Sequence, residues 1–404
     1  MSERSSSSLV QILCLFRYRL RPILIEAMNH WQENGKFKGW LALDKNAAAG
    51  QMEWGGFEPK PWEKTDIDIK ITHCGMCGSD MHVLRSEWGP TSYPLVVGHE
   101  IVGIAERVGT DVHHIRVGDR VGVGAQSDAC LCRKPPAVAQ DWSSCEACVT
   151  GHENRCPRAS MSYNGVFHSA AADGAKTMGG YASYHRCPSH FVFKIPNAIS
   201  SEHAAPLMCA GATVYSALGR VRTDPTGGMG QHLRGLRVGV IGVGGLGHLA
   251  IQFARAMGAE HLMAISRKVD KLGDVLELGA HSYIATDGED VGTQENDLDL
   301  IISTIAADGT ITKHLRLLKP GGRYIVLGMQ DAVLFDGKVL VVKEIGIMGS
   351  LIASPSEVRN MLQFAAEHCI KPWVEVRQMS QANSALEDME AGKARYRYVL
   401  CNNT

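Results

Sequence analysis

The sequence has almost no excess charge of either sign, no long apolar run and no visible internal repeat, and these absences exclude several classes of protein. Its 404 residues hold 41 Lys and Arg against 42 Asp and Glu, a formal net charge of −1. A near-neutral chain offers no basic surface for nucleic acid or an anionic membrane. No apolar stretch approaches the roughly 20 residues that a transmembrane helix needs. What remains is a globular protein whose length predicts two domains.

Residues 1–35 differ in composition from the rest of the chain and lack a convincing secretory signal. The first 24 residues are rich in Ser and Arg, and Glu3 is their only acid. This composition resembles a mitochondrial presequence, whereas the apolar run Leu9–Phe16 has no basic flank before it and no small-residue cleavage pattern close after it. The alternative is that Met28 is the true start and the preceding residues are a gene-model artefact. We expect a cytoplasmic protein, or a mitochondrial one if the presequence is genuine.

The 12 cysteines are clustered in a way that favours metal binding over a disulfide framework. Five of them lie within Cys130–Cys156, and two more form Cys74-Gly-Met-Cys77. Disulfides are typical of small secreted domains, so clustered thiols in a long chain without a secretory signal indicate metal thiolates.

A glycine-rich turn is the most informative stretch of the chain. Arg237–Ile241 is a short β-branched run typical of a buried parallel strand, and the G-x-G-x-x-G pattern of Gly242–Gly247 follows it directly. Leu246–Met257 then carries apolar residues at helical spacing. Glycines let the backbone approach a pyrophosphate, whose charge lies against the free N–H groups of the helix start. This context predicts a dinucleotide site; the alternative is a plain glycine-rich turn.

Two patterns of secondary structure divide the chain. From Lys36, short strands such as Asp66–Thr72 and Ile101–Val108 are separated by glycine turns, which predicts a compact β-rich barrel or sandwich. From about Ser201, helices and strands alternate. The six strands expected there imply a doubly wound parallel sheet, and so an α/β protein; they are Arg237–Ile241, His261–Ser266, His281–Ala285, Leu298–Thr304, Arg323–Gly328 and Val339–Gly349.

These patterns predict the domain organisation. We expect an N-terminal extension of residues 1–35, a catalytic domain built from residues 36–200 and 352–404, and a nucleotide-binding domain of residues 201–351. The last segment joins the first domain because Tyr396–Leu400 is strand-like and is expected to return to it.

One group of cysteines has the spacing of a structural metal site. Cys145-x2-Cys148-x7-Cys156 needs one more ligand, and either Cys130 or Cys132 lies just upstream. Four thiolates from one loop describe a closed zinc site that holds a long excursion in place. A loop of free cysteines is the alternative.

A second group is dispersed along the chain. Cys77 follows a strand, His99 lies between a strand and Glu100, and Cys209 lies in a predicted helix, His203–Val221. Two thiolates and one imidazole leave a fourth position open, which is typical of a catalytic zinc. Taken singly, each residue is more often part of a packed core, and spacing alone does not favour Cys77 over Cys74.

Motifs in both predicted domains carry a family resemblance: CGMCGSDMH (74–82), PLVVGHEIVG (94–103), VGVGAQSDAC (121–130), AAPLMCAGATVYS (204–216), VGVIGVGGLGHLAIQFA (238–254) and ARYRYVL (394–400). From about Lys36 onward the chain resembles zinc-containing medium-chain alcohol dehydrogenases, specifically the cinnamyl-alcohol-dehydrogenase branch with its fungal NADP-dependent members. The resemblance implies a GroES-like catalytic domain and a Rossmann cofactor domain. It also implies hydride transfer between an alcohol or aldehyde and a nicotinamide cofactor.

The resemblance assigns roles to individual residues. It implies catalytic-zinc ligands at Cys77, His99 and Cys209, with Asp80 orienting the histidine and Glu100 able to approach the metal. It implies that Ser79 accepts the alcohol proton and that His82 passes the proton outward, although a surface histidine is the alternative for His82 and a helix cap for Asp80.

The resemblance also places structural-zinc ligands at Cys145, Cys148 and Cys156. The family's first ligand position falls on Trp142 here, so an insertion of about thirteen residues (roughly Arg133–Ser144) is expected to separate it from the other three. We expect Cys130, rather than Cys132, to supply the missing ligand.

The cofactor preference is predicted from a missing carboxylate. An NAD enzyme usually has Asp or Glu about twenty residues beyond the glycines, where this chain has Ser266 and Arg267, with Lys271 further on. A hydroxyl and basic side chains bind a 2′-phosphate that a carboxylate would repel. We therefore expect NADP(H), with a solvated basic turn as the alternative; the expected cofactor-binding residues are Gly242, Gly244, Gly245, Leu246, Gly247, Ser266, Arg267 and Lys271.

The resemblance implies cinnamyl, benzyl and medium-chain aliphatic aldehydes or alcohols as substrates. Trp88, Tyr163 and Leu351 are candidate pocket residues, with ordinary packing as the alternative. The apolar run Val339–Gly349 is expected to form a sheet edge through which two copies form a homodimer. The alternative functions are a polyol- or formaldehyde-type zinc dehydrogenase and, in a different class, a non-catalytic zinc- and nucleotide-binding sensor.

Overall fold

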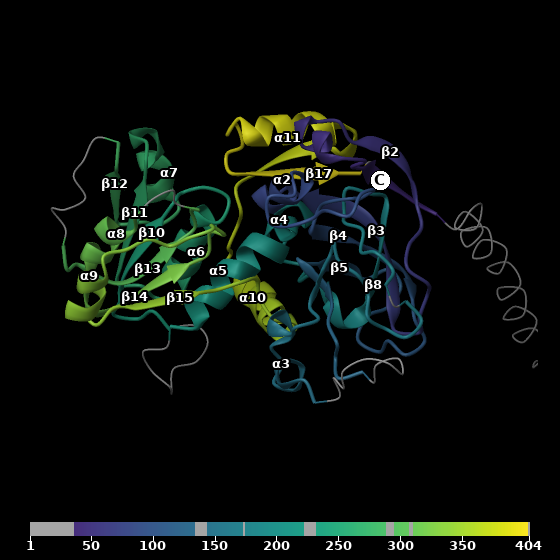
Figure 1. Cartoon of the computed structure of the whole chain (residues 1–404), viewed down its shortest axis with the longest axis horizontal. Coiled ribbons are helices and arrows are strands. Elements are labelled where there is room, and N and C mark those ends of the chain that lie inside the picture. Colours follow the sequence, from purple (N-terminus) through teal and green to yellow (C-terminus); the bar gives the residue numbers. More distant parts are fainter. Residues whose placement is uncertain are drawn as a thin grey trace, which may run out of the picture.

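The structure is a computed structural model that describes residues 36–133, 144–172, 174–221, 232–287, 295–306 and 310–402. Residues 1–35 and most of the expected insertion lie outside the described residues, so the two expectations for the N-terminal extension stay predictions. Two sheets, far apart in Figure 1, organise the described part of the chain. Among the described residues, no helix combines the length and the apolar character needed to cross a lipid bilayer.

The first sheet has seven strands, in the order β16-β17-β3-β4-β5-β9, with β8 also paired to β3. All of its pairings are antiparallel except β16 with β17. The strands are β3 (Asp66–Gly75), β4 (Glu100–Val108), β5 (Arg120–Val123), β8 (Tyr184–Pro188), β9 (Val192–Lys194), β16 (Val374–Gln378) and β17 (Arg397–Cys401). Two small pairs, β1 (Phe37–Leu41) with β2 (Glu53–Phe57) and β6 (Gln126–Asp128) with β7 (Ser160–Met161), complete this β-rich half.

The C-terminal strand returns to the first half of the chain, as the sequence predicts. Leu400 of β17 lies opposite Cys74 of β3, and Cys74 lies opposite Ile101 of β4. Residues that are far apart in sequence therefore share one sheet. The ends of β3 and β17 and the start of β4 lie close together as a result.

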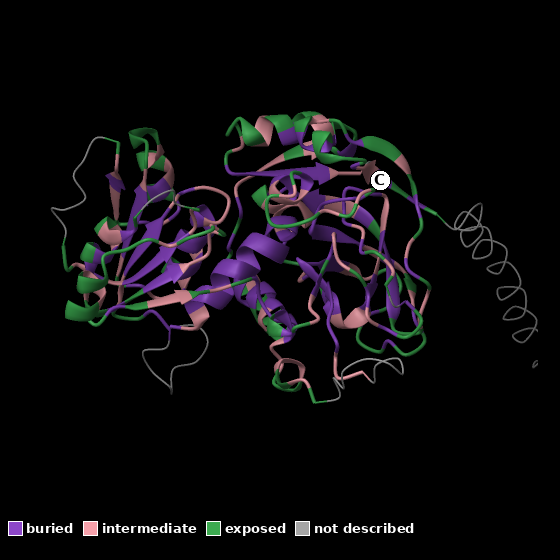
Figure 2. Cartoon of the chain, viewed as in Figure 1, coloured by how far each residue is buried: buried purple, intermediate pink, exposed green. Residues whose placement is uncertain are grey.

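The second sheet confirms the predicted parallel arrangement. Its six strands are all parallel and follow the order β12-β11-β10-β13-β14-β15. The strands are β10 (Arg237–Ile241), β11 (His261–Ser266), β12 (Ser282–Ala285), β13 (Leu298–Ser303), β14 (Leu318–Val326) and β15 (Gly346–Gly349). The helices are α6 (Gly247–Ala256), α7 (Leu272–Glu277), α8 (Thr312–Leu317) and α9 (Gly337–Val342). The middle strands are buried, as Figure 2 shows.

One predicted strand is partly wrong. The expected strand Val339–Gly349 is a helix in its first part, α9, and only Gly346–Gly349 is extended. The Asp336 side chain accepts a hydrogen bond from Lys338 N at 2.9 Å and caps α9. This local cap outweighs the weak strand preference of the valines, several of which are exposed and gain nothing from burial in a sheet.

Helices between the two sheets share one hydrophobic core. The chain runs from α4 (Ser201–Pro206) through a π-helical turn (Leu207–Gly211) into α5 (Ala212–Gly219). Helix α4 lies against β3 and β4, and α5 packs on both α6 and α10 (Pro355–Glu367), as Figure 1 shows. The predicted boundary near residue 200 therefore falls just before a helix that packs on the first sheet.

Two glycines of the turn after β10 differ in the space around them. A Cβ on Gly247 would lie 1.8 Å from the Gly242 carbonyl oxygen, whereas a Cβ on Gly244 would meet nothing within 4 Å. We expect Gly247→Ala to destabilise the protein by about 1–3 kcal/mol through overpacking, despite the better helix propensity of Ala.

The measurement is the thermal unfolding midpoint of the purified protein without cofactor. Gly244→Ala is the matched control and should unfold within about one degree of wild type, since a change well below 1 kcal/mol shifts the midpoint of a domain this size very little. Equal midpoints for the two variants would contradict the steric argument.

Candidate active site

The first group of candidate ligands begins where β3 ends. Cys77 follows β3 and precedes helix α2 (Gly78–Leu84), and its backbone N–H donates to Asp80 Oδ2 at 3.0 Å. Met76 N donates to Tyr398 O at 3.0 Å, which ties the same segment to β17. The Cys77 thiol is therefore fixed at a junction between three elements.

His99 and Cys209 reach the same point from other elements. His99 immediately precedes β4, after Gly98, whose φ of +98° and lack of space for a Cβ beside Tyr181 both require glycine. Cys209 lies in the π-helical turn. Such turns widen a helix by one residue and occur frequently at functional sites.

The three side chains converge in the structure. One ligand atom from each of Cys77, His99, Glu100 and Cys209 lies within 4.8 Å of all the others, and all four residues are buried. His99 Nε2 is 3.1 Å from Cys209 Sγ. Cys74, the alternative that spacing left open, is buried in the hydrophobic core and is absent from this group.

The electrostatics of the cluster favour one thiolate. The hydrogen bond with Cys209, and then His99 and Arg397, lower the pKa of the Cys77 thiol well below its usual value against the opposing effect of burial. The same bond with Cys77, together with burial, raises the pKa of Cys209 well above its usual value. A thiolate is the form that binds metals, so the lowered pKa of Cys77 is consistent with a ligand role.

A single carboxylate organises the back of the cluster. Asp80 is fully buried, and its Oδ1 lies 3.2 Å from His99 Nδ1. Its Oδ2 accepts from the Tyr181 hydroxyl at 2.8 Å, in addition to Cys77 N. A carboxylate buried among these hydrogen-bond partners can hold the His99 ring by its outer nitrogen.

Glu100 connects the cluster to the C-terminal strand. It forms a buried ion pair with Arg397 of β17, and one of its oxygens, Oε2, has no hydrogen-bond partner among the described residues. Burial raises the pKa of Glu100 to about 7, against the lowering effect of Arg397. A carboxyl group with a pKa of about 7 can change its charge near neutral pH.

A large cleft of about 1170 Å³ passes in front of this cluster. One wall comes from the turn after β10 and the end of β11, and the other from the C-terminal segment before β17 together with Met76 and Gly78, the two neighbours of Cys77. Of the eight predicted cofactor-binding residues, seven line the cleft: Gly242, Gly244, Gly245, Leu246, Ser266, Arg267 and Lys271. Gly247 lies beneath the turn instead, against the Gly242 carbonyl.

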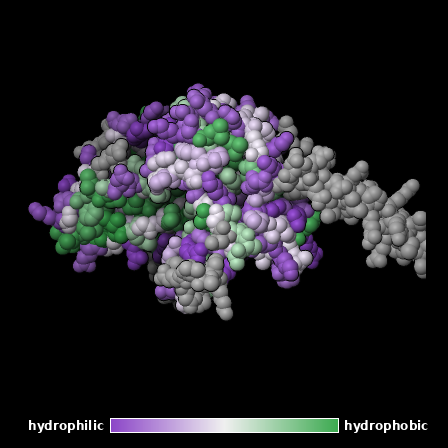
Figure 3. Space-filling view, turned by 45° about the vertical axis from the view of Figure 1, so that its right-hand side comes forward, coloured by the Kyte–Doolittle hydropathy of each residue, from purple (hydrophilic) through white to green (hydrophobic). Residues whose placement is uncertain are grey.

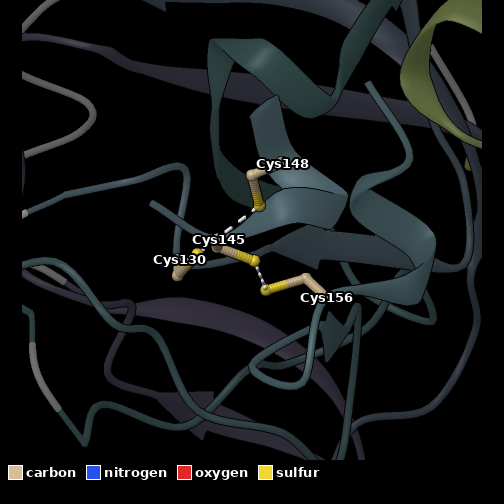
Figure 4. Close-up of side chains that lie close together, drawn as sticks. All are labelled: Cys130, Cys145, Cys148 and Cys156. Atoms are coloured by element: carbon tan, nitrogen blue, oxygen red, sulfur yellow. Dashed lines mark hydrogen bonds between the residues drawn. The ribbon is translucent and has the colours of Figure 1, made fainter. Parts of the chain in front are cut away.

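The cysteines of the long loop form a second group, shown in Figure 4. The sulfurs of Cys130, Cys145, Cys148 and Cys156 all lie within 4.8 Å of one another, with Cys130 to Cys148 at 3.5 Å and Cys145 to Cys156 at 3.9 Å. Cys132 lies outside the group, and its sulfur is 3.8 Å from the Cys145 carbonyl oxygen.

Both groups fit zinc by their donor chemistry. Four converging sulfurs match a closed tetrahedral site, and two sulfurs with an imidazole match a site with an open position. The group of Cys77, His99 and Cys209 is adjacent to the cleft, because both neighbours of Cys77 line it.

Comparisons with known proteins agree with this geometry. The family model "Alcohol dehydrogenase GroES-like domain" matches residues 63–197, and the model "Zinc-binding dehydrogenase" matches residues 245–367. A protein of Mesembryanthemum crystallinum named probable mannitol dehydrogenase is 35% identical over 371 residues, covering 90% of this chain and 93% of the relative.

Solved structures show the same similarity. A cinnamyl alcohol dehydrogenase from Sorghum bicolor has a TM-score of 0.80 and 34% identity, covering 91% of this chain and 97% of its own. The structure of CAD from Helicobacter pylori complexed with NADP(H) has a TM-score of 0.78 and 29% identity, covering 91% and 98%.

The chain belongs to the zinc-dependent medium-chain alcohol dehydrogenases. The expected family, the GroES-like domain and the Rossmann-type sheet are thereby confirmed. Cinnamyl alcohol dehydrogenases are among its relatives and structural neighbours.

Ser79 and His82 are the predicted proton-transfer residues of this alcohol dehydrogenase. Ser79 Oγ lies 3.6 Å from Cys77 Sγ, at the cluster itself. His82 lies one turn along α2, with Nδ1 2.5 Å from Glu87 Oε2 and its ring stacked on Trp88. Among the described residues, the hydrogen-bond partner of His82 is Glu87 rather than Ser79.

The candidate pocket residues do not line the cleft. Trp88 stacks on His82, and Leu351 is exposed, with its carbonyl oxygen accepting from Asn154. Tyr163 is buried against His99. Burial, and then the Asp80 carboxylate, raise the pKa of the Tyr163 phenol well above its usual value.

Sequence reasoning missed two buried partners of this alcohol dehydrogenase site. Arg397 pairs with Glu100 and lines the cleft, and Tyr181 holds Asp80. Arg397 belongs to the motif ARYRYVL, so its position was visible, but a pairing across 297 residues gives no local signal. Tyr181 follows a Gly-Gly pair that packs directly against Gly98 and Cys74, which only the folded chain shows.

Proposed function

We propose that this alcohol dehydrogenase interconverts primary alcohols and aldehydes by NADP(H)-linked hydride transfer, with one catalytic and one structural zinc per chain. The observation that supports this most directly is the cleft. It runs from the glycine turn to both neighbours of Cys77, so a dinucleotide lying on the turn would reach the ligand cluster. A nicotinamide and a metal-held substrate need this proximity for hydride transfer.

Different residues at the cluster have different roles in the proposed reaction. Cys77, His99 and Cys209 would hold the catalytic zinc, which polarises the substrate oxygen when bound. Ser79 lies beside Cys77 and is placed to take the alcohol proton. His82, with its side chain 42% exposed and bonded to Glu87, would deliver that proton to solvent.

NADP(H) is favoured by the charges at the end of β11. Ser266, Arg267, Lys268 and Lys271 line the cleft there, and the positions directly after the strand hold no acid. Asp270 also lines the cleft, but the three cations Arg267, Lys268 and Lys271 outnumber it. A similar chain from Helicobacter pylori has been solved with NADP(H).

The second cysteine group would hold the structural zinc. Its four sulfurs come from one loop, which connects β6 to β7. A metal there would hold the parts of this loop together. This arrangement supports Cys130, with Cys145, Cys148 and Cys156, as the ligand set.

The substrate class is proposed on the relatives. The relatives named cinnamyl alcohol dehydrogenase support the expected aromatic and aliphatic primary alcohols as substrates of this chain. The relative named probable mannitol dehydrogenase supports the polyol alternative. An aldehyde and polyol panel distinguishes the two.

We also propose a homodimer formed through the end of the parallel sheet. Within the described residues, β15 pairs with β14 on one side only, so its other edge is open. Next to it, Val341 and Val342 of α9 are 75% and 82% exposed. Figure 3 shows a broad hydrophobic area at the end of the molecule that carries the parallel sheet. A second copy would cover both the strand edge and the apolar side chains.

The central experiment measures NADPH oxidation across cinnamaldehyde, benzaldehyde and aliphatic aldehydes, with mannitol oxidation as the polyol arm. For the wild-type protein we expect turnover of the aldehydes and two zinc ions per chain. Cys209→Ala should hold one zinc ion and lose activity on the order of 1000-fold, because the several kcal/mol that polarisation by the catalytic zinc contributes are removed. Cys369→Ala, which changes an exposed cysteine, is the control and should keep both zinc ions and the wild-type activity. Two zinc ions without any turnover would favour the sensor alternative.

Arg267→Ala tests the cofactor preference. Loss of a charge-assisted hydrogen bond to the 2′-phosphate should raise the KM for NADPH by roughly 10- to 100-fold and leave the KM for NADH unchanged. Arg323→Ala, an exposed arginine on β14 outside the cleft, is the control. A wild-type enzyme that uses NADH as well as NADPH would defeat this proposal.

Val342→Asp tests the dimer. A buried charge at each symmetry-related α9 should weaken association at least tenfold, as measured by sedimentation or light scattering over a concentration series. Val117→Asp, at a 66% exposed position in the other half of the chain, should leave the wild-type mass unchanged. A monomeric wild type, or a Val342→Asp dimer of undiminished stability, would rule out this interface.

A further inference from the structure

A tyrosine with no role in the proposed reaction lies against His99. The Tyr163 hydroxyl is 3.1 Å from His99 Nδ1, and the two ring centres are 5.4 Å apart at an interplanar angle of 50°. Asp80 Oδ1 is 3.2 Å from the same nitrogen. Nδ1 therefore faces two oxygens, while Nε2 on the other side of the ring faces Cys209 Sγ.

Burial makes this contact significant. Tyr163 is only 4% exposed, and a phenol removed from water needs a polar partner for its hydroxyl. The groups near that hydroxyl are His99 and Asp80. A phenylalanine would fill the same volume without a hydroxyl. We therefore attribute the hydroxyl to hydrogen bonding with the polar groups around His99 and not to packing.

Tyr163 is held in place independently of the ligand cluster. Its neighbour Ser162 donates from N to Ala125 O at 2.8 Å and from Oγ to Gly124 O at 2.5 Å. On the other side, Asn164 has φ +54°, and its Oδ1 accepts from Ser92 N at 2.9 Å. None of these partners is itself a ligand, although Ala125 packs against Cys77 and Cys209, so hydrogen bonds to other residues give the phenol a fixed position against which His99 can be oriented.

We infer that Tyr163 is a positioning residue that fixes the plane of the His99 ring and so directs Nε2 toward the point shared by Cys77 and Cys209. One partner at Nδ1 defines only a line about which the ring can tilt. Two partners from different elements, Asp80 on α2 and Tyr163 after β7, define a plane. This inference rests on the proposed function, because it takes His99 as a ligand of the catalytic zinc.

The proton inventory agrees with this role. A neutral imidazole that gives Nε2 to a metal keeps its single proton on Nδ1, where both oxygens can accept it. Without the Tyr163 hydroxyl, Asp80 alone holds the ring. The ligand is then retained but less well ordered, and loss of such outer partners commonly weakens metal binding by roughly 10- to 100-fold.

The test follows zinc release from purified, zinc-loaded Tyr163→Phe into an excess of chromogenic chelator. The catalytic and structural ions are assigned with Cys209→Ala and Cys148→Ala, each of which lacks one of them. We expect the catalytic ion to leave roughly 10- to 100-fold faster than in wild type, and the structural ion to leave at the wild-type rate within twofold. The KM for NADPH should not change, since Tyr163 does not line the cleft.

Tyr215→Phe is the matched control. Tyr215 is 3% exposed and packs on Phe253 and Phe364, among helices that carry none of the cluster's ligands. Its variant should release both ions at the wild-type rates. A second measurement, the visible spectrum of protein with cobalt in the catalytic site, should shift in Tyr163→Phe and not in Tyr215→Phe, because that spectrum depends on ligand geometry.

The outcomes separate the possible failures. Wild-type release of the catalytic ion from Tyr163→Phe would overturn the inference, and so would faster release of both ions together, which indicates a general loss of stability. A wild-type protein that holds only one zinc ion would overturn the proposed function, and this inference with it.

Discussion

One buried carboxylate connects the residues of the candidate ligand cluster, which come from separate parts of the chain. Asp80 receives the backbone of Cys77, the ring of His99 and the hydroxyl of Tyr181, and Gly98 N lies 3.3 Å from its Oδ1. A charge taken fully out of water is tolerated only when hydrogen bonds replace its hydration. Because Asp80 accepts hydrogen bonds from all three, the end of β3, the turn before β4 and the segment before β8 are held in one arrangement.

The second constraint is the return of the C-terminal strand. Strand β17 pairs with β3, and this pairing brings Arg397 to Glu100 and the segment before β17 to the wall of the cleft opposite the glycine turn. The cleft is thus formed by pieces from the beginning, middle and end of the chain. The same pairing makes the first sheet discontinuous in sequence.

How well a feature could be predicted from the sequence depended on how far apart in the chain the interacting residues lie. The strand, turn and helix around Gly242–Gly247, the six parallel strands and the return of the tail rest on local periodicity, and they were predicted correctly. The first part of Val339–Gly349 was wrong because exposed valines imitate a buried strand. The contact of Tyr163 with His99 was missed because nothing in a tyrosine's sequence neighbours indicates a partner 64 residues away.

By itself the sequence determined which residue types were available: the spaced thiols, the glycine turn, and a hydroxyl and basic side chains where a carboxylate would otherwise stand. These are properties of short segments, and short segments are set by local backbone and side-chain preferences. Spacing did not choose between Cys77 and Cys74 or between Cys130 and Cys132; the tertiary structure shows that Cys77 and Cys130 join their clusters, as the family resemblance implied. Those choices depend on which face of a strand or loop is turned inward, and that direction is fixed by packing between distant elements rather than by the residue itself.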